Sequence, residues 1–111
     1  MTNRLLLVPA ALALSCASPL ALADGAGSGD PAAGESIYLG QCKSCHGPGA
    51  KGMASFPKLV GHEAGYIVGR LEQYRAGEKV GPNTALMAPQ ATGLSDEDIA
   101  HLAAYVASLD G

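Results

Sequence analysis

The most regular run of apolar residues lies near the C-terminal end of the 111-residue chain. Ser95 precedes this run as a predicted N-cap, and Asp98 lies at the capping-box position. The acidic residues 96–98 suit the positive end of a helix dipole. The apolar positions follow the i, i+3, i+4, i+7 spacing of one buried helical face, and they are Ile99, Leu102, Ala103 and Val106.

A second helix is predicted over residues 63–76, where Ile67, Leu71 and Tyr74 share a stripe and Gly77 ends the helix. A further helix is predicted to begin at Pro31, with Asp30 as its N-cap. Gly34 lies inside it, where glycine costs about 1 kcal/mol relative to alanine. Either another helix crosses closely at Gly34, or the first turn is weak.

The segments between the helices are long and irregular. Glycine and proline interrupt residues 47–61 and residues 78–93, and no stretch shows the alternation of a strand. Loops of this length in a small domain indicate a function such as wrapping a cofactor. The expected fold is therefore all-α, with three main helices joined by long loops.

The N-terminal residues read as a secretory signal peptide. A basic start, a short apolar core and an Ala-Leu-Ala ending predict cleavage after Ala23. The apolar run is too short for a comfortable membrane span, so no membrane insertion is expected after cleavage. Cys16 as a lipidation site is a weaker alternative. We expect residues 1–23 as signal peptide, 24–29 as a glycine-rich leader and 30–111 as one domain, exported to the periplasm.

The charge balance is acidic, with 10 Asp and Glu against 7 Lys and Arg. This excess disfavours nucleic acid and anionic membranes as partners, and it suggests basic patches on any protein partner. A mature domain this small often needs a cofactor for stability, and it has one Phe, four Tyr and no Trp to fill its core.

The pentapeptide Cys42-Lys43-Ser44-Cys45-His46 is the C-x-x-C-H signature of covalent c-type haem attachment. On one helical turn, the two thiols can add to the two vinyl groups of a porphyrin, and His46 can then bind the iron. A zinc site needs four ligands, for which the sequence offers no second pair. A redox dithiol normally follows a strand, which is not predicted here.

The opposite face of the iron is taken by a side chain or left open. Met87 is the favoured ligand, because its segment has little hydrophobic periodicity to place it in a core and Pro89 stiffens the backbone nearby. Met53 is expected as a contact at the haem edge. His62 is expected to cap the next helix or face solvent, and His101 to lie at the surface.

On these residues the chain resembles the class I c-type cytochromes, and more narrowly the small bacterial c4, c5 and c553 group. The matching stretches cover residues 31–109, and they include 34–38, 42–47, 56–61, 71–77, 87–89 and 94–105. His62 departs from the group, whose members commonly carry Gln there. Gln90 also departs, since c4-type chains often have a second Met at that position.

The resemblance implies a cytochrome c-like fold in which Gly34 and Tyr38 cross the last helix near Tyr105. It implies that the Pro57 carbonyl accepts the free N–H of His46 and that Leu59 packs on the haem.

It also implies that Met87 is the second ligand of the iron, opposite His46.

We expect a monohaem c-type cytochrome, not an enzyme, that carries one electron between redox proteins such as a dehydrogenase, a cytochrome complex or a terminal oxidase. One haem c would be held through Cys42 and Cys45, and the protein would be a monomer or weak dimer. One alternative is a haem-bearing subunit of a sulfide- or alcohol-oxidising dehydrogenase. Another is an open-site haem sensor or peroxidase.

Overall fold

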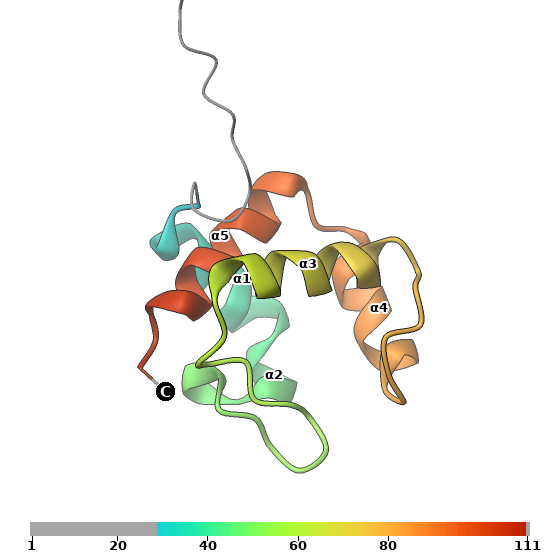
Figure 1. The fold of residues 1–111 in the computed structure, drawn as a ribbon. Helices are drawn as coiled ribbons and strands as arrows, with labels where there is room; N and C mark the ends of the chain where they lie inside the picture. The colour runs from blue at the N-terminus through green and yellow to red at the C-terminus, as the bar shows by residue number, and fades with distance from the viewer. Residues whose placement is uncertain (1–28, 111) are drawn as a thin grey trace, which may run out of the picture.

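The computed structural model describes residues 29–110, which form five α-helices and one short 3-10 helix (Figure 1). The expected signal peptide and all but Gly29 of the leader lie outside the described residues. Within residues 29–110 no helix combines the length and the apolar character needed to cross a membrane. The helices are α1 (Pro31–Gln41), α2 (Lys43–His46), η1 (Pro48–Ala50), α3 (Ala64–Arg75), α4 (Thr84–Thr92) and α5 (Asp96–Ser108).

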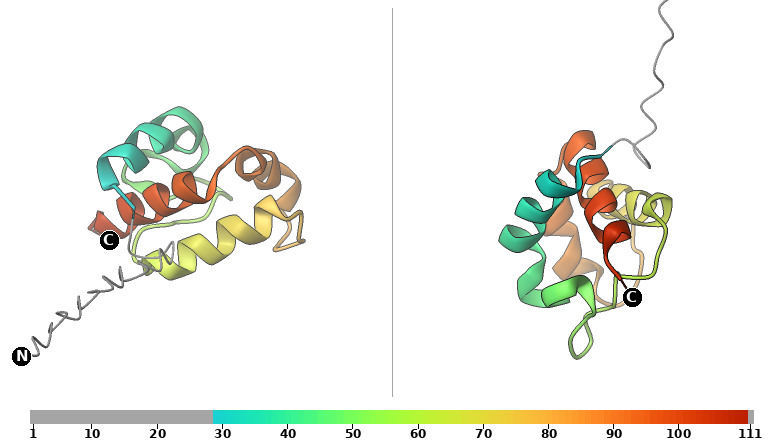
Figure 2. Two further views of the ribbon diagram at one scale, coloured as in Figure 1. Left: turned by 90° about the horizontal axis from the view of Figure 1, so that it is seen from above. Right: turned by 90° about the vertical axis from the view of Figure 1, so that its left-hand side faces the viewer.

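Helix α5 is the centre of the fold and lies between α1 and α3, as the two views of Figure 2 show. Its apolar stripe is buried as the sequence predicts, and it packs with residues of the other helices into one core. The largest side chains with almost no exposed surface are Tyr38, Val60, Ile99 and Val106. Burying a side chain of this size contributes roughly 1.5–3 kcal/mol, so α5 supplies much of the stability of the domain.

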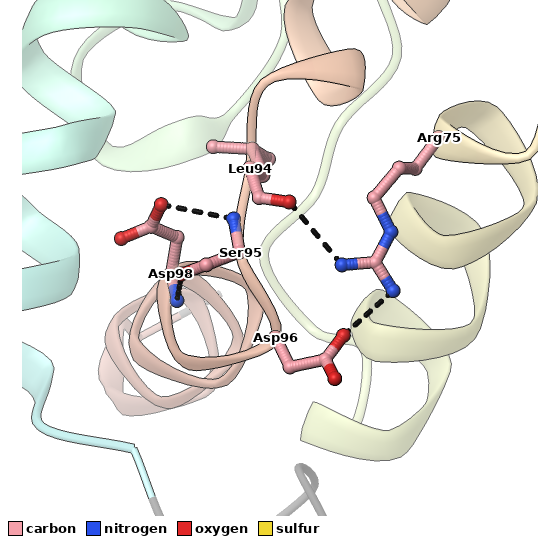
Figure 3. Close-up of polar contacts among 5 residues, drawn as sticks. All are labelled: Arg75, Leu94, Ser95, Asp96 and Asp98. Atoms are coloured by element: carbon pink, nitrogen blue, oxygen red, sulfur yellow. Dashed lines mark hydrogen bonds and ion pairs between the residues drawn. The ribbon is translucent and has the colours of Figure 1, made fainter.

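The predicted start of α5 is confirmed, and it is tied to α3 (Figure 3). The Ser95 side chain accepts from the Asp98 N–H, and the Asp98 carboxylate accepts from the Ser95 N–H, each at 3.0 Å. Arg75, the last residue of α3, donates to the Leu94 carbonyl at 3.2 Å and pairs with the Asp96 carboxylate at 2.7 Å. The side chain of Asp96 is 84% exposed, so we assign this ion pair little energy.

Helix α1 crosses α5 closely at Gly34, which decides between the two interpretations of that glycine. A Cβ atom at Gly34 would lie 1.9 Å from the carbonyl oxygen of His101 and 2.8 Å from Cβ of Tyr105. The rings of Tyr38 and Tyr105 pack next to this point, with centroids 5.5 Å apart. The predicted crossing near Tyr105 is therefore confirmed.

His101 is not the surface residue that the sequence suggests. It is partly buried, and its Nδ1 accepts a hydrogen bond of 2.8 Å from the backbone N–H of Asp30. Asp30 caps α1 as predicted, since its side chain accepts from the Ala32 N–H. The histidine thus fixes the beginning of α1 to the middle of α5. Helical periodicity assigns a residue to one face of its helix. It does not predict which backbone group of another segment will contact that residue.

The all-α prediction is confirmed, but the expected irregular stretch 78–93 contains α4. Residues 84–92 are rich in good helix formers. The sequence suggests that Pro89 breaks this segment, but the helix continues through it to Thr92. Thr84 organises the turn before the helix, because its hydroxyl accepts from two backbone N–H groups, those of Val80 and Gly81. Pro89 withdraws one N–H from the helix, but Ala85, whose carbonyl loses that donor, is exposed to water.

Candidate functional site

The Cys-x-x-Cys-His motif lies where α1 passes into α2. The N–H of Cys42 still bonds to the Tyr38 carbonyl of α1, while its own carbonyl accepts from the His46 N–H at 2.9 Å and begins the next turn. Cys42 therefore lies between α1 and α2, and Cys45 and His46 follow it within one helical turn. All three line a cavity of about 410 Å³, a size within the range of ordinary ligand pockets.

His46 is held in one orientation by the loop that follows it. Its side chain is 6% exposed, and its Nδ1 lies 2.8 Å from the carbonyl oxygen of Pro57. Because a carbonyl only accepts, Nδ1 must carry the proton, and Nε2 then keeps its lone pair. This is the tautomer that an imidazole needs to bind a metal ion, and the hydrogen bond fixes the orientation of the ring.

The loop at residues 47–61 brings Pro57 to His46 by folding back on itself. The carbonyl of His46 accepts from the Gly52 N–H at 2.8 Å, and the Ala50 carbonyl accepts from the Leu59 N–H at 2.9 Å. Gly52 has φ +83° and lies against the backbone of residues 56–58, where a Cβ atom would have no room. The length of the loop lets it bring the Pro57 carbonyl back to His46. Gly52 permits the tight turn that this requires.

Tyr38 also lines the cavity. It is 1% exposed, and its hydroxyl donates to the carbonyl of Gly47, the residue directly after the motif. Burial, followed by the neighbouring thiol of Cys42, raises the pKa of Tyr38 to about 12. The hydroxyl therefore stays protonated and holds the end of α2 against α1.

Cys42 does not have the lowered pKa of a thiol in a redox-active dithiol. Burial and the neighbouring charge of Cys45 raise its pKa to about 11, whereas redox-active dithiols have lowered values. Helix α1, and not a strand, leads into the motif. Within residues 29–110, no three His, Cys, Asp or Glu side chains gather where they could hold a metal ion. The dithiol and zinc alternatives thus find no support in the part of the chain that the structure describes.

Met87 reaches the same cavity from α4, and Leu59 lines it from the loop. Met87 is only partly exposed, and it lies on a helix instead of the irregular loop that the sequence suggests. The remaining wall is mostly apolar and includes Leu71 of α3 and Leu102 and Val106 of α5. A flat, apolar macrocycle bound through two thiols fits this combination of a cysteine pair, an oriented imidazole and an apolar wall.

The other candidate ligands are placed differently. Met53 is 44% exposed and is not among the residues that line the cavity, so the cavity lends no support to the expected contact at a haem edge, which stays a prediction. Its backbone pairs with that of Phe56 in a tight turn of the loop. His62 is exposed, as expected, but it also lines the cavity and stacks on Tyr66 with ring centroids 4.1 Å apart.

Sequence reasoning missed one row of side chains on α3 and in the residues just before it. His62, Tyr66 and Arg70 follow each other at intervals of four residues, and all three line the cavity. The Arg70 guanidinium lies 5.3 Å from the centroid of the Tyr66 ring, and its Nε donates to the Tyr66 hydroxyl at 3.3 Å. The interval of four was visible in the sequence, since residues i and i+4 share one helical face.

Fold and site together define a class of protein: a small helical domain that attaches a macrocycle through a Cys-x-x-Cys-His motif. Residues 31–110 match the profile of the family described as Cytochrome c. The chain is 49% identical over 82 residues to cytochrome c-554(548) of Halomonas halodenitrificans, covering 73% of this chain and 98% of that protein. The chain belongs to the cytochrome c family.

Two further relatives are longer than this chain. It is 40% identical over 70 residues to a "Thiosulfate dehydrogenase electron acceptor" of Stutzerimonas stutzeri, covering 61% of this chain and 31% of that protein. The crystal structure of reduced cytochrome c4 from Pseudomonas stutzeri matches with a TM-score of 0.64 at 35% identity, covering 76% of this chain and 52% of that one. The match to this structure confirms the cytochrome c fold.

Membership of the family establishes the coarse function. The cofactor is haem c, attached covalently through the cysteine pair, and the single motif in the sequence makes the protein a monohaem cytochrome. The protein is an electron carrier and not an enzyme.

Proposed function

We propose that this cytochrome carries single electrons in the periplasm with an iron bound by His46 and Met87. The observation that carries the proposal is the shared cavity: His46, with its free Nε2, enters from α2 and Met87 enters from α4. When bound, haem c supplies one-electron chemistry at its iron, which a histidine and a methionine tune to a fairly positive potential.

The protein's own residues bind and orient the cofactor and exclude water from it. Cys42 and Cys45 provide the covalent links, and the Pro57 carbonyl holds the imidazole of His46 in place. Leu59, Leu71 and the α5 side chains cover the macrocycle with apolar surface. No side chain of this set needs to gain or lose a proton, which suits a carrier whose electron transfer requires little rearrangement.

The ligand assignment is tested by the visible spectrum of the protein produced with haem-attachment machinery. The oxidised protein should show the weak far-red band of a methionine bound to ferric haem, and Met87→Ala should abolish this band. Met53→Ala is the matched control and should leave the spectrum unchanged, because Met53 is outside the cavity wall. A wild-type spectrum that is high-spin, or that survives Met87→Ala, would refute His46/Met87 ligation and favour an open-site sensor or peroxidase.

The periplasmic location is proposed from the predicted signal peptide and from the requirement that c-type haem be attached outside the cytoplasm. N-terminal sequencing of the exported protein should begin at Asp24. A mature protein that retains residue 1, or one lipidated at Cys16, would contradict the proposed cleavage.

A role as the electron-accepting partner of a dehydrogenase is the second candidate. It is favoured by the relative whose name describes it as the electron acceptor of thiosulfate dehydrogenase. Co-purification from the native host separates the two: a free carrier elutes alone, whereas an enzyme subunit remains bound to its dehydrogenase.

A further inference from the structure

The side chain of His101 joins the beginning of α1 to the middle of α5, at the end of α1 that lies away from the Cys-x-x-Cys-His motif. Its Nδ1 lies 2.8 Å from the backbone nitrogen of Asp30. Because a backbone N–H only donates, Nδ1 is the nitrogen without a proton, and Nε2 carries the proton of the neutral ring. His101 is not among the described residues that line the cavity, so this contact is separate from the cofactor site.

Two glycines show that the chain is seated on the backbone of α5 on both sides of this contact. A Cβ atom at Gly29 would lie 1.9 Å from the carbonyl oxygen of Ala100, and one at Gly34 would lie 1.9 Å from the carbonyl oxygen of His101. Within residues 29–110, no other hydrogen bond links the segment 29–41 to α5. The bond from the Asp30 N–H therefore fixes a close approach that otherwise depends on packing alone.

Protonation of His101 would remove the acceptor of this bond. An imidazolium donates from both ring nitrogens, so a proton on Nδ1 would point at the Asp30 N–H, a donor against a donor. The added positive charge would also lie at the beginning of α1, where the helix dipole is positive. Because the closed arrangement needs Nδ1 without a proton, it binds fewer protons than the open one. Its stability must therefore rise with pH.

The neighbouring carboxylates do not replace the lost bond. The Asp30 carboxylate already accepts from the Ala32 N–H, and the Asp98 carboxylate accepts from the Ser95 N–H, each at 3.0 Å. A pair between an imidazolium and an exposed carboxylate contributes little. Other ionisable side chains near this part of α5 include Glu35 on α1, Glu97 and Tyr105 on α5, and Arg75, which α3 brings to Asp96 on the other side of α5 (Figure 2).

We propose that His101 and the Asp30 N–H form a pH-sensitive latch, which holds the beginning of α1 on α5 when the ring is neutral and releases it when the ring is protonated. The latch acts on the first turn of α1, because the other end of this helix is held by the hydrogen bond from the Tyr38 hydroxyl to the Gly47 carbonyl. Acid therefore opens the junction between α1 and the residues before it, while the motif keeps its structure. The inference does not depend on the ligands or partners proposed above.

Nitrogen NMR of the labelled, haem-loaded protein in its reduced state tests the latch. An imidazole ordinarily changes its charge between about pH 5 and about pH 8, whereas carboxyl groups do so at lower pH. At about pH 8 the His101 ring should show one tautomer, with the proton on Nε2. From there to about pH 5, exchange of the Asp30 amide with water, corrected for its intrinsic rate, should rise about fivefold, the factor that one hydrogen bond contributes to a local opening equilibrium.

Substitution of the histidine separates the acceptor from its titration. In His101→Asn the amide oxygen can take the place of Nδ1 and accept at every pH in this range, so the corrected exchange of the Asp30 amide should stay slow throughout. In His101→Ala it should be fast throughout. His62→Asn is the matched control, because it removes another imidazole that is exposed and distant in the sequence, and it should leave the fivefold change intact.

Three results would overturn the latch. A ring that carries its proton on Nδ1 at about pH 8 could not accept from the Asp30 N–H. An Asp30 amide whose corrected exchange does not change while the ring titrates would mean that the protonated ring stays docked. The same acid response in His101→Asn as in the wild type would assign that response to another group. The first two results are read from the wild-type protein, so they decide the proposal even if the variants fail to fold.

Discussion

Replacing Gly34 by alanine should destabilise the protein, although alanine is the better helix former. The added Cβ would lie 1.9 Å from the His101 carbonyl oxygen, more than 1 Å inside any normal contact, so α1 and α5 would have to separate. Overpacking of this kind costs about 1–3 kcal/mol. Separation would also weaken the hydrogen bond from the Asp30 N–H to His101, which is worth about 1 kcal/mol.

Alanine recovers about 0.5–1 kcal/mol of helix propensity, which leaves a net loss of about 2 kcal/mol. For a domain of this size, such a loss lowers Tm by on the order of 10 °C. Gly40→Ala is the matched control, because Gly40 lies in the same helix and a Cβ atom added there would meet no other atom within 4 Å. This substitution should raise the free energy of unfolding by up to about 1 kcal/mol.

The assay is urea unfolding of the haem-loaded proteins, followed by far-ultraviolet circular dichroism and by haem absorbance. The two variants should move the midpoint in opposite directions with little change in m-value, so that their free energies of unfolding differ by about 3 kcal/mol. If Gly34→Ala were as stable as Gly40→Ala, the close crossing of α1 and α5 would be refuted, and with it the reason given for Gly34.

Three further predictions follow from individual contacts. The buried Tyr38, with its pKa raised to about 12, contributes stability that is complete below pH 10 and is lost as pH rises through 12. The fall is at most about 3 kcal/mol, because the part due to the Cys42 thiol is lost once haem is attached, and Tyr38→Phe should remove it from the alkaline unfolding profile. An identical alkaline profile in the Phe variant would contradict this. Ser95→Ala should cost about 1 kcal/mol in urea unfolding by removing the acceptor for the Asp98 N–H, and an unchanged midpoint would show that the cap is redundant. Gly52→Ala should cost at least about 1 kcal/mol, because φ is +83° and the neighbouring backbone leaves no space; a neutral result would mean that the loop can relax.

The sequence predicts what depends on neighbours along the chain. The cap of α5, the stripe of α3 and the Asp30 cap of α1 are local patterns, and each is confirmed. The haem motif is likewise a local spacing, and family membership supports it. Gly34 shows the limit, because its cost in a helix indicated a crossing but could not name the partner backbone.

Contacts between distant residues explain most of what the sequence could not supply. The hydrogen bond from Asp30 to His101 joins residues 71 positions apart. Neither the capping pattern at Asp30 nor the helical pattern around His101 indicates it. Helix α4 was missed for a different reason: the unfavourable Pro89 is local, whereas the burial of Ala91 that favours the helix comes from the tertiary fold.

The position of α5 links the stability of the domain to its cofactor site. The cysteine pair lies where α1 passes into α2, while Leu102 and Val106, which line the same cavity, belong to α5. The helix at the centre of the core is therefore also one wall of the cavity. A change that loosens α5 would open the cofactor site as well as destabilise the domain.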